Sequence, residues 1–459
     1  MAIKPTVSNL NASTVGILNA IRDNASSDYY NAVPKAQDTT ESIQAVGQAI
    51  LSYQPRMNEF VSSLVNRIAR VVVTSKLYKN KLAYAKQGIM EFGESIEEIF
   101  VDIAKVEGYD WNSANDVEQA FKRRNPDIKS AFHAMNLQVY YPATVTEKNL
   151  RQAFLSIDGV TNIIARIVDS IYSAAAYEEY IMFKYLLAVN MLNGNVAMEH
   201  IDEITDETSG KSAVKKIKYI VGDMHYMSDK YNIAGVNTFI PDDEAPETFI
   251  TVKAEADMDV DVLAMAFNMD KVQWTGRRVQ VDSLSFNSGE LKRLKMLLAN
   301  DPTYVEFTED ELNALKTVPV VLLSRDYFKV YDNLLEFTEQ YNAAKLYWNE
   351  FLHKWSTYSA SPFAPICALT SSTPSITTVT VSAPANAAAN SVVKADANVT
   401  ATPFANKGVT FSISPATNVS IDEITGLIKF GAEATGNYTV KATSVFDPSK
   451  SGTATIAVS

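Results

Sequence analysis

Cysteine and histidine are scarce in this chain of 459 residues. Cys367 is the only cysteine, which excludes a disulfide within the chain, and the four histidines stand far apart. Neither H-E-x-x-H nor paired cysteines occur, and His225 with Asp229 is too small a set for a metal site. We therefore expect no bound metal, and we interpret Cys367, close to Pro365, as part of a linker.

Sequence patterns of catalysis and nucleotide binding are also absent. SGKS at 209–212 ends like a phosphate-binding loop, but Thr205 stands where that loop requires glycine. The segment DMDVDVLAMAFN begins like a calcium loop, but Val262 and Asn268 occupy its glycine and glutamate positions. No G-x-S-x-G nucleophile elbow occurs. The sequence predicts neither an enzyme nor a cofactor-binding protein.

Long hydrophobic runs are lacking as well. The run IMFKYLLAV is interrupted by Lys184 and is far too short to span a bilayer, so we expect no membrane partner. The first 15 residues have no apolar core after a positive start, so we expect no secretory signal and synthesis in the cytoplasm.

Positive charge is deficient, and the deficit lies in one part of the chain. Residues 370–459 hold five basic and five acidic residues, so the remaining 36 basic and 48 acidic residues carry the whole net charge of −12. A surface of that sign repels phosphate, which argues against nucleic-acid binding as the main activity. We interpret the basic clusters at 215–218, 277–278 and 292–295 as solvated faces.

The composition changes within residues 361–375, where Trp, His and Met give way to Ala, Thr, Ser and Val. Beyond a boundary near 370, apolar residues alternate, as at Val409, Phe411 and Ile413. About seven short strands at this spacing predict an immunoglobulin-like sandwich. The front part mixes helix and strand, so the predicted fold class is α+β followed by an all-β domain.

Helix and strand patterns divide the front part. Apolar residues recur every three or four positions from Glu147 to Met191, which predicts one long helix of roughly 60–70 Å with a kink at Gly159. We expect several short helices in 1–70, and strands with one short helix, over 113–124, in 71–146. In 210–345 we expect strands that alternate with helices, one of them over 260–269. An aromatic-rich segment over 340–355 closes the front part.

One charge pattern predicts contact between subunits. A basic segment is followed by an acidic one, and the residues concerned are Lys76, Lys79, Lys81 and Lys86, then Glu91, Glu94, Glu97 and Glu98. Oppositely charged arms of an extended strand-loop-strand would pair across identical subunits arranged head to tail. An internal hairpin that neutralises itself is the alternative, and the sequence leaves both open.

Six stretches, in order along the front part, resemble the major capsid protein family of phi-twenty-nine-like short-tailed bacteriophages. They are AVGQAIL, FVSSLVNRIARVVV, ESIEEIFVDIAK, MDVDVLAMAFNM, FKVYDNLLEF and LYWNEFLHKWSTYSASPFA. The tail, with VTFSISP and then VSIDEITGLIKFGAEATGNYTVKATS, resembles a bacterial Ig-like (group 2) module, although Phe411 stands where that module commonly has Trp. The resemblance implies the Hong Kong ninety-seven type tailed-phage capsid fold followed by an Ig-like domain.

The resemblance also implies a division of the chain and a set of partners. The implied domains are a shell domain over 1–370 and an Ig-like domain over 371–459. The shell domain would consist of an N-terminal arm (1–70), an extended loop region (71–146), a spine helix with the peripheral domain (147–209), an axial domain (210–345), and a segment that returns to the peripheral domain and forms the linker (346–370). Identical subunits would form pentamers and hexamers, with a scaffolding protein and a portal during assembly. The icosahedral or prolate head would enclose double-stranded DNA without binding it specifically. Residues 288–317 look like an insertion, which leaves their local fold open.

Two other functions compete with a shell in the virion. A bacterial surface adhesin would explain the Ig-like module but requires an export signal. An encapsulin-like compartment shares the shell fold, but that family is usually shorter and lacks the sandwich.

Overall fold

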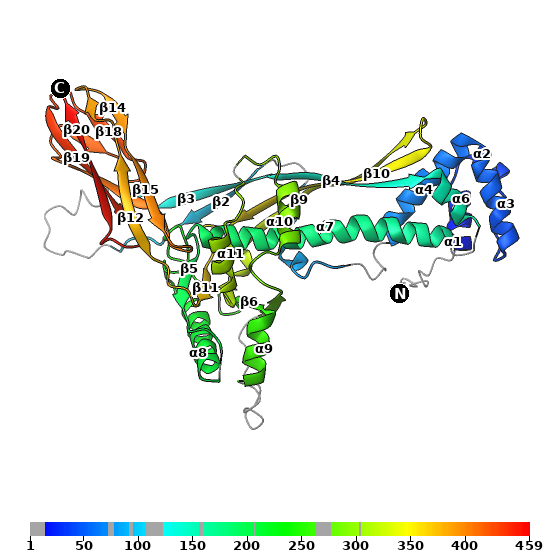
Figure 1. The fold of residues 1–459 in the computed structure, drawn as a ribbon, viewed down its shortest axis with the longest axis horizontal. Coiled ribbons are helices and arrows are strands. Elements are labelled where there is room, and N and C mark those ends of the chain that lie inside the picture. Colours follow the sequence, from blue (N-terminus) through cyan, green and yellow to red (C-terminus); the bar gives the residue numbers. More distant parts are fainter. Residues whose placement is uncertain are drawn as a thin grey trace.

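The computed structural model describes residues 14–71, 78–90, 95–106, 123–155, 159–205, 207–261, 277–302 and 304–459. The molecule is elongated, with a β sandwich at one end and a group of helices at the other (Figure 1). A long helix, α7, and long β-strands connect the two ends (Figure 1).

The helical arm folds around its own hydrophobic core. Its helices are α1 Thr14–Asp23, α2 Ser27–Ala32, α3 Thr40–Leu51 and α4 Gln54–Val71. The side chain of Thr39 accepts a hydrogen bond from the backbone of Ser42 at the start of α3, which satisfies one of the free amides there. Phe154 and Trp348 join this core from other parts of the chain, so the arm is anchored to the body.

The predicted long helix is divided in two, which corrects the sequence prediction. Helix α6 covers Glu147–Ala153, and α7 begins at Gly159 and runs for 34 residues to Leu192. At 1.5 Å per residue α7 is about 50 Å long, shorter than predicted. The apolar period continues across the break, so periodicity alone does not reveal it. Gly159 is the first residue of α7 and not a kink within one helix.

A four-stranded sheet lies along α7, in the order β1-β9-β10-β4. The strands are β1 Gly88–Ile89, β4 Leu137–Thr146, β9 Phe328–Asn342 and β10 Tyr347–Ala360. Alternation places Leu352 on the face that packs against Ile171 and Ala175 of α7. Because β9 belongs to this sheet, residues 328–342 lie with α7, whereas the resemblance implied the axial domain for them.

A five-stranded sheet in the order β5-β11-β8-β6-β7 forms the second part of the body. The strands are β5 Ala197–His200, β6 Glu247–Thr251, β7 Arg277–Val281, β8 Val320–Leu323 and β11 Ile366–Thr370. Helices α8 Glu207–Asp223 and α9 Val252–Asp261 contribute to the core on one face, and α7, α10 and α11 to the core on the other. Cys367 is fully buried within β11, so its interpretation as a linker residue was wrong.

The described part of residues 288–317, whose fold the sequence left open, contains two capped helices, α10 Ser288–Leu297 and α11 Glu309–Lys316. Asn287 and Glu290 form a capping box at the start of α10. Lys184 of α7, 1% exposed, contacts Glu290 at 3.0 Å and Asp282 at 3.1 Å. Helix α10 is therefore held directly on α7.

The last 84 residues form a β sandwich with its own core. Its strands are β12 Ile376–Ser382, β13 Asn386–Ala387, β14 Val392–Lys394, β15 Asp396–Ala401, β16 Val409–Ser414, β17 Val419–Ile421, β18 Leu427–Phe430, β19 Gly436–Ser444 and β20 Ser451–Val458. Phe411, Val440 and Ile456 point into the core, as the alternation predicted. Most of the helix expected over 113–124 and most of the one expected over 260–269 lie outside the described residues.

Candidate subunit interface

A two-stranded ribbon exposes a row of apolar side chains. Strand β2 Ser95–Val101 pairs antiparallel with β3 Ile128–Ala134. On the outer face the apolar side chains are between 56% and 68% exposed, and they are Ile99, Val101, Ile128 and Phe132. Large exposed apolar rows of this kind mark surfaces that bind other proteins.

The other face of the ribbon is fixed to the body. Phe100 stacks on Phe363, with ring centroids 5.5 Å apart. Lys129 donates to the carbonyl oxygen of Ala234 at 2.8 Å. Because the inner face has these partners, the ribbon presents its apolar face in a defined direction.

Glu98 is the main electrostatic anchor of the ribbon. Its carboxylate lies 3.2 Å from Lys329 Nζ and 3.1 Å from His133 Nε2, and it accepts a hydrogen bond from Ser361 at 2.9 Å. Burial acts to raise the pKa of Glu98, but the His133 hydrogen bond and the Lys329 charge outweigh it and hold the pKa below its usual value. The carboxylate is thus charged and paired within its own chain.

A second charged cluster fastens the spine helix to the sheet. Glu179 of α7 accepts from Lys354 of β10 at 2.5 Å, from Lys86 at 3.1 Å and from Asn80 at 2.8 Å. Lys86 also contacts Asp332 of β9. Burial acts to raise the pKa of Glu179, and the charges of Lys354 and Lys86 reverse that shift and lower it. Three segments of the chain meet at this carboxylate.

The sequence-predicted charged residues have different positions. Lys86 and Glu98 make the intrachain pairs just described, whereas Lys79, Lys81 and Glu97 are exposed. Lys76, Glu91 and Glu94 lie outside the described residues. The acidic segment pairs with β3, and the described basic segment forms a short 3-10 helix, Ala83–Ala85, so the two segments are not the arms of one hairpin.

Sequence reasoning missed Glu179, Lys354 and the apolar face of the ribbon. Trp348, Leu352 and Lys354 are separated by even numbers of residues, so they lie on the same, buried face of β10. This spacing is the signal in the sequence that Lys354 is buried. For Glu179 the sequence holds no such signal, because its partner Lys354 is 175 residues away.

An aromatic group on the outer face of the β4–β9–β10 sheet is a second candidate surface. Tyr140 is 60% exposed, and its ring lies 5.8 Å from that of Phe351 and 6.1 Å from that of His353.

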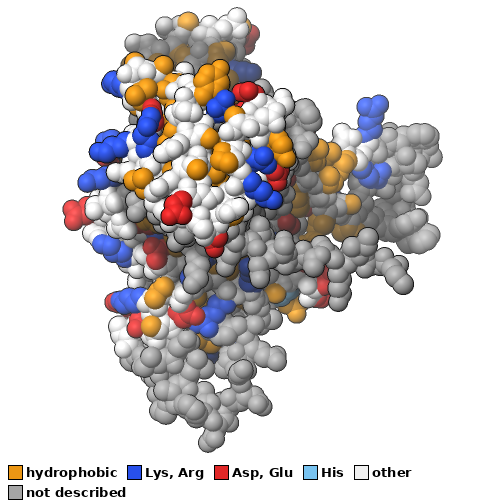
Figure 2. Space-filling model, turned by 90° about the vertical axis from the view of Figure 1, so that its right-hand side faces the viewer, with side chains coloured by type: hydrophobic (Ala, Val, Ile, Leu, Met, Phe, Trp, Pro, Cys, Tyr) orange, Lys and Arg blue, Asp and Glu red, His pale blue; other side chains and the backbone are white. Residues whose placement is uncertain are grey.

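At the end of the molecule that holds the helical arm, basic and acidic side chains are interspersed with hydrophobic ones (Figure 2). Such mixed surfaces suit contacts between proteins better than binding to a polyanion.

Among the described residues, no group of three or more His, Cys, Asp or Glu side chains is arranged to hold a metal ion. None of the described helices is long and apolar enough to cross a membrane. The exposed apolar row of the ribbon is the kind of surface by which a protein contacts other proteins.

Comparison with known proteins identifies the family. A family model described as the Phi29-like phage major capsid protein matches residues 18–370. The chain is 33% identical to the major capsid protein of Bacillus phage B103 over 436 residues, which are 93% of this chain and 89% of the relative. It is 31% identical to that of Bacillus phage PZA, with the same coverage. The chain belongs to the Phi29-like phage major capsid protein family.

Membership of this family gives the chain its function. It is a non-enzymatic structural protein of the phage head shell, located in the virion, and it assembles with identical subunits. The comparisons give no support to the adhesin or to the encapsulin-like compartment.

Two solved structures with low sequence identity are also similar. The capsid structure of Staphylococcus phage Andhra has a TM-score of 0.47 and 13% identity, covering 66% of this chain and 86% of that chain. A chain from a structure of the head fiber and inner core protein of native bacteriophage P68 has a TM-score of 0.48 and 15% identity, covering 65% and 86%.

Proposed function

We propose that the β2–β3 ribbon joins neighbouring subunits by laying its outer apolar face on the next copy, and that pentamers and hexamers close into the head shell. The observation that carries this proposal is the exposed row that includes Ile99 and Phe132 on a ribbon whose other face is already occupied. Covering this row on a second copy removes apolar surface from water, which favours association.

Exposed charges orient the same contact. The side chains of Lys79, Lys81 and Glu97 are exposed, and Lys76, Glu91 and Glu94 remain candidates from the sequence. Contacts between unlike charges on successive copies act mainly on specificity and on the rate of association. We do not include Lys86 and Glu98 among the residues that contact the next copy, because their charged partners are in their own chain.

The chain divides into two domains with separate roles. A boundary at 370 is supported by the end of β11 at Thr370, by the family match that ends there, and by the separate core of the sandwich. Residues 1–370 form the shell, with α7 and its sheet as the peripheral part and the five-stranded sheet as the axial part. Residues 371–459 form an Ig-like (group 2) module on the outer surface.

Assembly involves a scaffolding protein and a portal, and the shell encloses double-stranded DNA without specific contacts. The formal charge of −12 supports weak contact with DNA, because a lining of that sign repels phosphate.

The test is assembly of the purified chain, with and without a scaffolding protein, followed by sedimentation and negative-stain microscopy. The wild type is expected to form rings or closed shells, and Phe132→Lys is expected to remain folded but to reduce assembly at least tenfold. Ile424→Lys is the matched control, because Ile424 is 84% exposed on the sandwich and outside the ribbon. Equal assembly by the two variants would exclude the ribbon as the contact, and a wild type that stays monomeric under every condition would exclude self-assembly through these surfaces.

A further inference from the structure

The sandwich and the shell domain are joined by more than the link between β11 and β12. The loop between β15 and β16 reaches from the sandwich to the end of α7, and its residues Phe404 and Ala405 enter different cores. Phe404, 1% exposed, belongs to the shell core that contains Met191 and Val196, and Ala405, fully buried, belongs to the sandwich core. One peptide unit therefore connects the two hydrophobic cores.

The backbone conformation at this joint has a specific cause. Phe404 has φ +73°, in the left-handed region that a residue with a side chain rarely adopts. This conformation allows the loop to send one side chain into the shell domain and the next into the sandwich. The surrounding structure must hold it in place, because the conformation is unfavourable for an isolated phenylalanine.

Gly194 shows how closely the two domains approach. It follows the last turn of α7 with φ +71°, and its amide donates to the carbonyl oxygen of Met191 at 3.0 Å. A Cβ atom at Gly194 would lie 2.4 Å from Cα and 2.5 Å from the backbone nitrogen of Asn406. Such a contact is with backbone, which cannot rotate away, so only glycine permits this approach.

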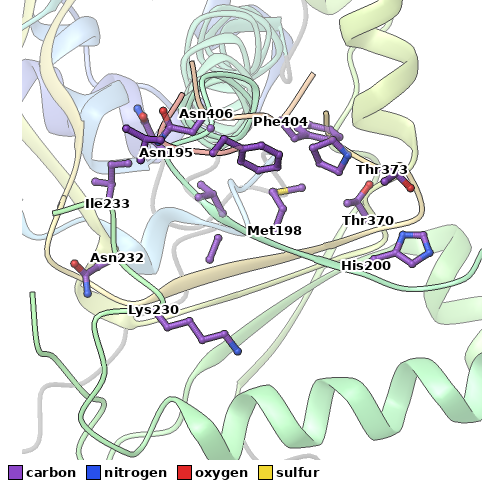
Figure 3. Close-up of a pocket in the computed structure, with 16 residues that line it drawn as sticks. Asn195, Met198, His200, Lys230, Asn232, Ile233, Thr370, Thr373, Phe404 and Asn406 are labelled. Atoms are coloured by element: carbon purple, nitrogen blue, oxygen red, sulfur yellow. The ribbon is translucent and has the colours of Figure 1, made fainter. Parts of the chain in front are cut away.

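Polar contacts fix the same loop within the sandwich. Asn406 Oδ1 accepts from the amide of Gly408 at 2.7 Å, and Ser375 donates its amide to Thr402 Oγ1 at 2.8 Å. Beside the joint is a cavity of about 420 Å³. In Figure 3, Phe404, Asn406 and Asn195 lie along its upper rim, and His200 and Lys230 line it below.

We propose that Phe404 and Gly194 are positioning residues that lock the sandwich rigidly onto the end of the spine helix. The sandwich then completes the shell-domain core and points in one fixed direction, so it is not a tethered module that moves freely. The proposal concerns the single chain and does not rest on how the subunits assemble.

The test uses the unassembled full-length chain and matched pairs of variants. Phe404→Ala is compared with Phe446→Ala, because Phe446 lines the same cavity from the sandwich but is 42% exposed. Gly194→Ala is compared with Gly235→Ala, because Gly235 also has a positive φ, +58°, but nothing lies within 4 Å of its added Cβ. The second pair thus isolates the interdomain contact from backbone strain.

Calorimetry is expected to give one cooperative unfolding transition for the wild type, Phe446→Ala and Gly235→Ala. Phe404→Ala and Gly194→Ala are expected to separate the melting of the sandwich from that of the shell domain, and to speed amide hydrogen exchange at 402–408 at least tenfold. Two independent transitions in the wild type, or no difference within the Gly194 and Gly235 pair, would overturn the proposal. If Phe404→Ala does not fold, the comparison of Gly194→Ala with Gly235→Ala and the amide hydrogen exchange of the wild type at 402–408 still test the proposal.

Discussion

Lys354 of β10 donates a hydrogen bond to Glu179 of α7 at 2.5 Å, and both side chains are only 7% exposed. The pair connects the spine helix to the sheet that lies along it. Lys86 brings a second positive charge to the same carboxylate, and Asn80 donates to its other oxygen. The geometry resembles a clamp in which one acid on the helix holds two other segments of the chain.

Replacing Lys354 with methionine is expected to destabilise the fold by about 3 kcal/mol, because removal of one partner leaves buried charge poorly compensated. Urea unfolding of the unassembled chain measures the loss. The control is Lys79→Met, at an exposed position, which is expected to change stability by no more than about 0.5 kcal/mol. A loss no larger than that of the control would show that the clamp contributes nothing to stability.

Local periodicity in the sequence accounts for the elements that were predicted well. The alternation at Val409, Phe411 and Ile413 reflects strand geometry, and the structure places these residues along β16 with Phe411 in the core. The helical period from Gly159 to Leu192 is similarly local. Such patterns arise from neighbouring residues, so no knowledge of the distant chain is needed to interpret them.

Features that depend on distant residues could not be predicted in this way. The break before α7 is invisible in the sequence because apolar residues continue through it, whereas in the structure Phe154, directly after α6, packs into the arm core. Cys367 lies in a short apolar run near prolines, which is typical of a linker as well as of a buried strand. The ribbon was placed in an extended region, but its apolar row becomes visible only when β2 and β3 are aligned in register.

Gly47 of α3 faces Phe154, and an added Cβ would lie 2.6 Å from the Cβ and Cγ atoms of that ring-bearing side chain. We expect Gly47→Ala to destabilise the chain by about 1–3 kcal/mol through overpacking of the arm core. Gly222→Ala in α8 is the matched control, since nothing lies within 4 Å of its added Cβ. The control is expected to be neutral or to stabilise by up to about 1 kcal/mol. Thermal unfolding of both variants compares them, and equal effects would contradict the tight packing at Gly47.

Cys367 is expected to be unreactive in the native protein. It is fully buried on β11, the second strand of the five-stranded sheet, and burial raises the pKa of its thiol well above the usual value. Thiolate is the reactive form, so both access and ionisation are suppressed. A coloured thiol reagent should label the chain only when denaturant is added, at the rate of global unfolding. Rapid labelling in native buffer would contradict the placement of this strand.

Glu350 gives the fold a distinctive dependence on pH. The side chain is 1% exposed, its Oε2 atom has no hydrogen-bond partner, and it stands opposite Glu339 in the β9–β10 pairing. Burial, followed by the charge of Glu339, raises the pKa of Glu350 from 4.5 to about 8. The folded protein therefore retains a proton at neutral pH that the unfolded chain releases.

The sign of the effect follows from proton binding. Below pH 4.5 the Glu350 carboxyl holds a proton in both the folded and the unfolded chain, so this residue does not make the free energy of unfolding depend on pH there. Between pH 4.5 and about 8 the unfolded chain binds fewer protons, so the free energy of unfolding falls by up to about 1.4 kcal/mol per pH unit. Glu350→Gln keeps the shape of the side chain without its charge, so it should remove this slope and be more stable than the wild type at pH 9.

Urea unfolding from pH 5 to pH 9 measures the difference between the two proteins, which isolates Glu350 from every other titrating group. Glu336→Gln, an exposed acid on the same strand as Glu339, is the control and should follow the wild-type curve. If Glu350→Gln also follows that curve, the Glu350 carboxyl does not hold a proton in the folded chain at neutral pH.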